Sequence, residues 1–132
     1  MAIWTHPKFL RTVLLADAAT CVATGLLMTG GSSIVAGLTH LPANLLTSAG
    51  LSLFPIAAFI AFAATRTLTW PLGVWAVIVG NIGWVVGSVW LLFSGTIAPN
   101  GLGHVFVITQ ALAVAILVQL EIVGVRRLAT TA

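Results

Sequence analysis

Charged side chains are scarce in this chain of 132 residues, where five Lys or Arg and two acidic residues make up only 5% of the sequence. Soluble domains carry about 25% charged residues. Hydrophobic residues account for 60% of the chain, and a soluble fold of this length could not bury so large an apolar share. The scarcity of charge therefore excludes a soluble protein and predicts an integral membrane protein.

The sequence also lacks the signatures of nucleic-acid binding, disulfide bonding and catalysis. The basic residues are few and dispersed, so the formal net charge of +3 does not indicate a nucleic-acid partner. The single cysteine, Cys21, excludes an internal disulfide. The sequence contains no serine elbow, Walker loop or Rossmann glycine pattern. We therefore expect a protein that is not an enzyme, binds no nucleic acid and holds no cofactor.

Four apolar stretches of similar length fill most of the chain. Each has about 20 residues or slightly more, which is enough to cross ~30 Å of hydrocarbon. They predict an all-α fold, in which a single transmembrane domain over residues 1–132 forms a four-helix bundle. A short apolar segment in the first loop, Ser33–Leu38, is expected to lie on the membrane surface. The predicted membrane helices cover residues 9–28, 44–64, 71–93 and 102–125.

All basic residues fall on one side of this predicted bundle. Four crossings place both termini on the same side, together with the second loop, whereas the first and third loops carry no Lys or Arg. Cytoplasmic loops are the ones enriched in Lys and Arg. We therefore expect both termini in the cytoplasm and a multi-pass protein of the bacterial inner membrane. The residues that set this bias are Lys8, Arg11, Arg66, Arg126 and Arg127.

Glycines recur every seven residues along the third predicted helix, at Gly73, Gly80 and Gly87. Small residues on one seam of a membrane helix let a neighbouring backbone approach closely. The repeat therefore predicts a helix-packing surface.

Three spans carry polar groups near their middle: Asp17 in the first, Asn81 in the third and Gln110 in the fourth. A charged side chain at the bilayer centre costs roughly 2.5–3.5 kcal/mol on insertion scales, so such groups are expected to face protein or water. Asp17 and Asn81 lie at similar depth, which allows a hydrogen bond across the bundle. Asn81 shares its face with Trp84 and Ser88, while Thr20, Cys21, Thr24 and Met28 follow Asp17 on one stripe.

Two interpretations of these intramembrane groups remain open. They form a proton relay or polar substrate pocket, or they are hydrogen-bonded pairs that fix helix packing. Glu121 is placed about one turn from the cytoplasmic end, where an ion pair with Arg126 or Arg11 is expected. His40 and His104 both lie on the outer side, but two histidines do not complete a metal site, so no metal is predicted.

Three segments resemble a group of small, uncharacterised four-helix proteins of the bacterial inner membrane. They are Leu14–Ala18, the set Asn81, Trp84, Ser88, Leu91 and Leu92, and the set Gln110, Ala111, Ala113 and Val114. The resemblance implies the four-helix architecture and no activity. Small multidrug resistance exporters are similar only in having four helices and an acid midway along the first, so no functional residue is carried over from them.

The sequence thus supports two functional hypotheses. The first is an accessory or structural subunit that packs in the bilayer against itself or against other subunits of an inner-membrane complex, because the loops are short and the soluble surface is small. The alternative is a small oligomeric transporter or lipophilic-ligand binder with Asp17 as its coupling site. The sequence favours the first, because it places no second charged side chain near Asp17.

Overall fold

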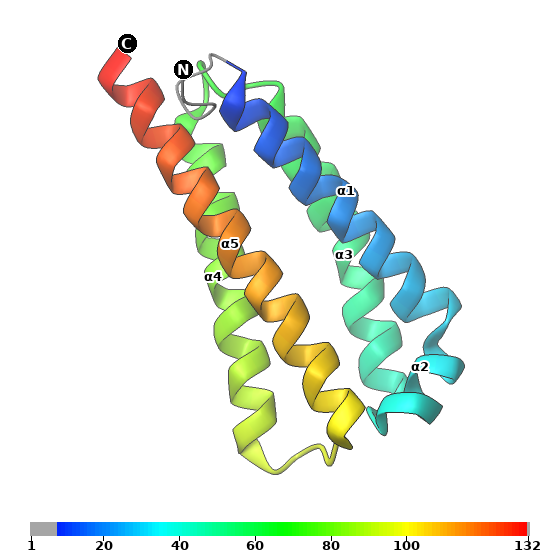
Figure 1. Cartoon of the computed structure of the whole chain (residues 1–132). Helices are drawn as coiled ribbons and strands as arrows, with labels where there is room; N and C mark the ends of the chain where they lie inside the picture. The colour runs from blue at the N-terminus through cyan, green and yellow to red at the C-terminus, as the bar shows by residue number, and fades with distance from the viewer. Residues whose placement is uncertain (1–7, 132) are drawn as a thin grey trace.

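The computed structural model describes residues 8–131, and side chains as far as Arg127. This part of the chain is helical and contains no strand. Four of its helices are long and apolar enough to cross a membrane, so the chain is a multi-pass membrane protein. The helices are α1 (Phe9–Gly30), α2 (Ser32–Thr39), α3 (Ala43–Ala64), α4 (Pro71–Ser94) and α5 (Gly101–Thr131) (Figure 1).

The four long helices lie where the hydrophobic pattern predicts them, and most of their ends agree within one turn. α4 begins at Pro71, because proline suits the first turn of a helix. It ends at Ser94, and the next residue, Gly95, has a φ of 76°, the left-handed conformation that glycine adopts readily. The exception is α5, which continues to Thr131 instead of ending near residue 125.

The long helices form two hairpins. α1 packs most extensively against α3, and α4 packs against α5; the hairpins meet mainly through α1 and α5. The start of α1 and the end of α5 lie at the same end of the bundle (Figure 1), which we call the terminal end. The opposite end, where the short helix α2 lies, is called the α2 end.

α1 and α3 approach each other closely at two glycines. A Cβ on Gly25 would lie 3.1 Å from the Gly50 carbonyl oxygen, and a Cβ on Gly50 would lie 2.9 Å from Met28 Cβ. The two backbones therefore approach closely, as small residues allow.

The predicted glycine seam of α4 is not an interface within the chain. No atom of another helix lies within 4 Å of where a Cβ would stand on Gly80 or Gly87. Gly73 instead lies under the ring of Trp70, the residue that precedes α4. The seven-residue spacing identified a face of α4, but at Gly80 and Gly87 no other helix of the chain packs against it.

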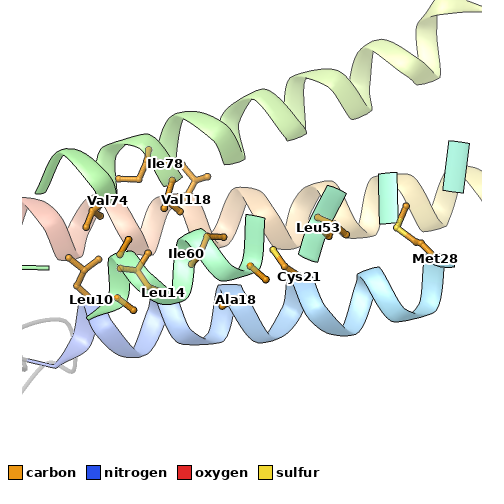
Figure 2. Close-up of a cluster of buried hydrophobic side chains, with 14 of the residues drawn as sticks. Leu10, Leu14, Ala18, Cys21, Met28, Leu53, Ile60, Val74, Ile78 and Val118 are labelled. Atoms are coloured by element: carbon orange, nitrogen blue, oxygen red, sulfur yellow. The ribbon is translucent and has the colours of Figure 1, made fainter. Parts of the chain in front are cut away.

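A packed apolar core closes the bundle toward the terminal end. Leu14, Val74 and Ile78 are all fully buried. Figure 2 shows Leu10 and Leu14 of α1 reaching toward Val74 and Ile78 of α4, with Val118 of α5 and Ile60 of α3 beside them. This core holds the two hairpins together on that side.

A hydrogen-bonded clasp joins the hairpins at the α2 end. The Asn100 backbone N–H donates to the Thr39 carbonyl at 3.1 Å, and Asn100 Nδ2 donates to the Leu38 carbonyl at 2.9 Å. Asn100 Oδ1 accepts from the Gly103 N–H at 2.8 Å. The segment expected to lie on the membrane surface is therefore a short helix whose C-terminus is tied to the start of α5.

Candidate functional site

Three polar side chains from three helices meet between the hairpins. Asp17 of α1, Asn81 of α4 and Glu121 of α5 form what we call the carboxyl–amide cluster. Asn81 Nδ2 donates to Asp17 Oδ2 at 2.7 Å and to Glu121 Oε1 at 3.1 Å. The exposed fractions are 1% for Asp17, 8% for Asn81 and 0% for Glu121. The cluster is therefore a buried polar junction that bridges the two hairpins.

The structure contains the expected hydrogen bond between Asp17 and Asn81 but corrects the expectation for Glu121. Glu121 forms no ion pair with Arg126 or Arg11, both of which are exposed. Because α5 runs on to Thr131, Glu121 lies deeper in the bundle than a helix ending near residue 125 would place it. A second carboxyl group thus stands beside Asp17.

Hydrogen-bond acceptors outnumber donors in the carboxyl–amide cluster. Asp17 Oδ1 accepts only the weak thiol contact from Cys21 Sγ, at 3.7 Å. Glu121 Oε2 is buried without a partner. Both Nδ2 hydrogens of Asn81 are used, and its Oδ1 accepts from no described residue.

A second polar cluster joins α4 to α5. Trp84 Nε1 donates to Gln110 Oε1 at 2.7 Å, and Gln110 Nε2 donates to Ser88 Oγ at 3.0 Å and to the Val107 carbonyl at 2.9 Å. Ser88 Oγ donates in turn to the Trp84 carbonyl at 2.8 Å. The structure thus brings Trp84, Ser88 and Gln110 together, and the N–H groups of this cluster are all used.

A cavity of about 860 Å³ lies between the two hairpins and is lined by all five helices. Small-molecule sites typically have volumes of about 300–1,000 Å³. Its walls are mostly apolar, and it meets the carboxyl–amide cluster at Asp17 and Asn81. Trp84 and Gln110 lie along its wall, and α2 contributes Val35 at its end.

The cavity opens sideways onto the apolar surface of the bundle. Ile56 and Phe59 of α3 line it and are themselves 38% and 40% exposed, and Val105 of α5 lines it and is 59% exposed. In a membrane-spanning bundle such surfaces face lipid. Part of the cavity wall therefore belongs to the surface that faces lipid.

The two candidate histidines both lie at the α2 end. His40 ends α2 with a φ of 58°, and His104 Nδ1 lies 3.0 Å from the Asn100 carbonyl oxygen. Within residues 8–131, the described side chains include no group of three or more His, Cys, Asp or Glu that could hold a metal ion.

The sequence left a substrate pocket open as one interpretation without locating it, although one signal pointed toward its place. Thr20, Cys21 and Thr24, which share the Asp17 stripe of α1, all line the cavity. An apolar helix that carries several small polar residues on one stripe indicates a face that does not contact lipid. The volume itself depends on how the two hairpins are set against each other, which no single helix pattern encodes. No family model, curated protein or solved structure matches this chain.

Proposed function

We propose that this protein is a membrane-embedded binding protein for a lipophilic amine, whose amino group lies against Asp17. The observation that carries the proposal is an apolar cavity of about 860 Å³ with a buried carboxyl group in its wall. Intramembrane acids that face a cavity commonly mark a ligand or ion pathway.

The walls of the cavity favour a ligand that is mostly apolar. Phe59, Ile56 and Val105 present apolar surface where the cavity opens toward lipid. A molecule dissolved in the bilayer could enter sideways without passing through water. Burial of its apolar surface against side chains, in place of lipid, gains packing contacts rather than a hydrophobic driving force, so the polar contact sets the specificity.

The polar groups of the cavity favour a hydrogen-bond donor. The indole and amide N–H groups that line it, from Trp84, Gln110 and Asn81, are all used within the protein. Acceptor capacity remains at Asp17 Oδ1, which takes only the weak Cys21 thiol contact, and at Asn81 Oδ1, which accepts from no described residue. An ammonium group supplies both the donors and the positive charge that an ionised carboxylate needs in an apolar site.

Two observations favour ligand binding over the purely structural role that the sequence alone suggested. The bundle has room for a ligand between its hairpins. A second carboxyl group, Glu121, adjoins Asp17, whereas a packing pair needs only one acceptor for the Asn81 amide. A second acid in the bilayer adds a cost that a single packing pair would not incur.

The proposal is tested by equilibrium binding of radiolabelled dodecylamine to the full chain in lipid nanodiscs, with lipid-only nanodiscs subtracted. We expect saturable binding of one molecule per chain. Asp17→Asn should weaken it by more than about tenfold, because a buried charge pair is lost.

The matched control is Thr20→Val, which removes a polar group from the same helix and the same cavity at nearly constant volume. Thr20 Oγ1 is already bonded to the Ala16 carbonyl, so affinity should change little. Dodecanoate, with the same chain and a negative head, should not bind. Dodecylamine that does not saturate, or that binds equally to wild type and Asp17→Asn, would overturn the proposal.

The accessory-subunit hypothesis keeps one observation in its favour, the exposed glycine face of α4. Gly83 and Gly87 have nothing within 4 Å of a Cβ position, and such a face suits another membrane helix. A role as a subunit predicts that Gly83→Leu and Gly87→Leu abolish cross-linking to a second copy in native membrane. Unchanged cross-linking in both variants contradicts it.

The proposed setting is the bacterial inner membrane with both termini in the cytoplasm. The asymmetry of Lys and Arg supports this orientation. In a Cys21→Ser background, a cysteine placed at Ser33 should react with an impermeant maleimide from outside the cell, and one placed at Thr67 should not. The reverse pattern contradicts the orientation.

A further inference from the structure

We infer that the apolar chain of the bound amine runs from Asp17 toward the α2 end, and that Val35 of α2 sets the chain length that the cavity accepts. This inference rests on the proposed function and specifies the ligand as an amine with an apolar chain of about 12–15 carbons. Asp17 remains the group that binds the amine. Val35 is a specificity-determining residue that contacts the far end of the chain.

The first step concerns the end of the cavity at which the amino group lies. Among the described residues that line the cavity, Asp17 is the only acid and none is basic. At the α2 end the hydroxyl group of Thr39 is already engaged: it donates to the Val35 carbonyl at 2.6 Å and accepts from the Leu41 N–H at 3.3 Å. An ammonium group bonds more strongly to a carboxylate than to neutral acceptors. The amino group therefore lies at Asp17.

The second step concerns the side of Asp17 on which the chain has room. Toward the terminal end, the lining on α4 reaches only as far as Ala76, about 7 Å along the helix from Asn81. Beyond this point lies the packed core around Leu14 and Val74, which are fully buried and do not line the cavity. A long chain cannot extend in this direction without displacing the core.

Toward the α2 end the lining continues much farther. On α1 it runs from Asp17 to Leu27, about 15 Å along the helix, and on α5 it runs from Val114 back to Leu102, about 18 Å. An extended chain advances about 3.5 Å for every three bonds. A path of this length therefore accommodates a chain of about 12–15 carbons.

The third step concerns the wall at which this path ends. Val35 and Thr39 of α2 line the cavity and are 7% and 4% exposed. Asn100 holds α2 against the start of α5 through its bonds to the Leu38 and Thr39 carbonyls. A chain that ends short of α2 leaves part of the lining without contacts, and a longer chain must displace α2 or bend toward lipid. The position of α2 thus selects the chain length.

The experiment measures saturable binding of octylamine, dodecylamine, tetradecylamine and octadecylamine to the full chain in nanodiscs, with affinity expressed per amine dissolved in the lipid. We expect dodecylamine and tetradecylamine to bind about threefold or more tightly than the shorter and the longer amine. Equal affinities across the series, all of them lost in Asp17→Asn, overturn the inference and leave the proposed function intact. Absence of saturable binding for every amine refutes the proposed function itself.

Substitution of Val35 tests its role in selecting the chain. Val35→Phe should shift the preferred length by about two carbons toward shorter amines, because the ring extends farther into the cavity. Val35→Ala should shift it toward longer amines, and it tests the same point should Val35→Phe not fold in a thermal unfolding experiment. The matched control is Ile34→Phe, at a neighbouring position that is 71% exposed and outside the lining. No shift in either Val35 variant, or the same shift in Ile34→Phe, overturns the assignment.

Photo-cross-linking reads the direction of the chain independently. Dodecylamine with a diazirine on its last carbon should label α2 and the start of α5, and dodecylamine with a diazirine beside the nitrogen should label α1 around Asp17. Mass spectrometry of the peptides locates both adducts. Last-carbon adducts near the terminal end, with the other adduct still at Asp17, overturn the direction alone. Adducts of the diazirine beside the nitrogen on α2 contradict the proposed function.

Discussion

Asn81 Nδ2 lies 2.7 Å from Asp17 Oδ2, although 64 residues separate the two in sequence. The bond joins α1 to α4, which belong to different hairpins, and the same nitrogen reaches Glu121 of α5. One amide group thus serves two carboxyl groups. The stability of the interface and the chemistry of the cavity depend on the same atom.

Replacing that amide should lower the free energy of unfolding. Asn81→Leu leaves two buried carboxyl groups without their N–H donor, and each loss is expected to cost about 1–3 kcal/mol. The measurement is the free energy of unfolding in mixed micelles. The triple variant Asp17→Leu, Asn81→Leu, Glu121→Leu should recover most of the loss, because all members of the network are then apolar. A triple variant as unstable as Asn81→Leu would argue against this explanation.

The contact between Gly25 and Gly50 should tolerate no added methyl group. In Gly50→Ala the new Cβ would lie 2.9 Å from both Met28 Cβ and Thr29 Cγ2, so α1 and α3 must separate at a cost of about 1–3 kcal/mol. The matched control is Gly37→Ala, where nothing lies within 4 Å and the gain in helix propensity should leave stability equal or slightly higher. Thermal unfolding in detergent compares the two, and equal melting temperatures would contradict the tight contact.

Ligand binding should be visible in the fluorescence of one tryptophan. Of the tryptophans that the structure describes, Trp84 lines the cavity, while Trp75 and Trp90 are exposed on the outside of α4. Dodecylamine should therefore change the emission of the wild type and of Trp90→Phe but not that of Trp84→Phe. A response that survives Trp84→Phe would place the amine elsewhere.

The clasp at the α2 end should control how often that end opens. Asn100→Ala removes its bonds to the Leu38 carbonyl and the Gly103 N–H, at about 0.5–1.5 kcal/mol each. Hydrogen exchange of the α2 amides should accelerate accordingly. Asn44→Ala, at an exposed position on α3, is the control and should leave exchange unchanged. If both variants exchange at the wild-type rate, Asn100 does not hold α2 in place.

The sequence predicted the helices because the backbone N–H and C=O groups of each apolar stretch must hydrogen-bond within that stretch when it lies in lipid. A long helix meets this requirement. The sequence also predicted that Asp17 and Asn81 meet, since depth in the bilayer is a simple function of position along a helix. Both inferences depend on local pattern and on the fixed thickness of the membrane.

Glu121 and the glycines of α4 show where that reasoning ends. The place of Glu121 depended on where α5 stops, and helix ends are weakly encoded when the chain continues with helix-compatible residues such as Arg126 and Arg127. Gly80 marked a face suited to close packing, but the sequence does not say whether the partner belongs to the same chain. The cavity was beyond reach, because it arises from the relative placement of two hairpins.

The division into two hairpins also has a consequence for biosynthesis. The hairpin of α1 and α3 leaves the ribosome before Asn81 and Glu121 have been made, so Asp17 reaches the bilayer ahead of its hydrogen-bond donor. A neutral carboxyl group enters lipid at lower cost than a carboxylate. Newly inserted protein therefore holds Asp17 without a partner from the second hairpin, and this acid first gains the Asn81 donor when the second half of the chain docks.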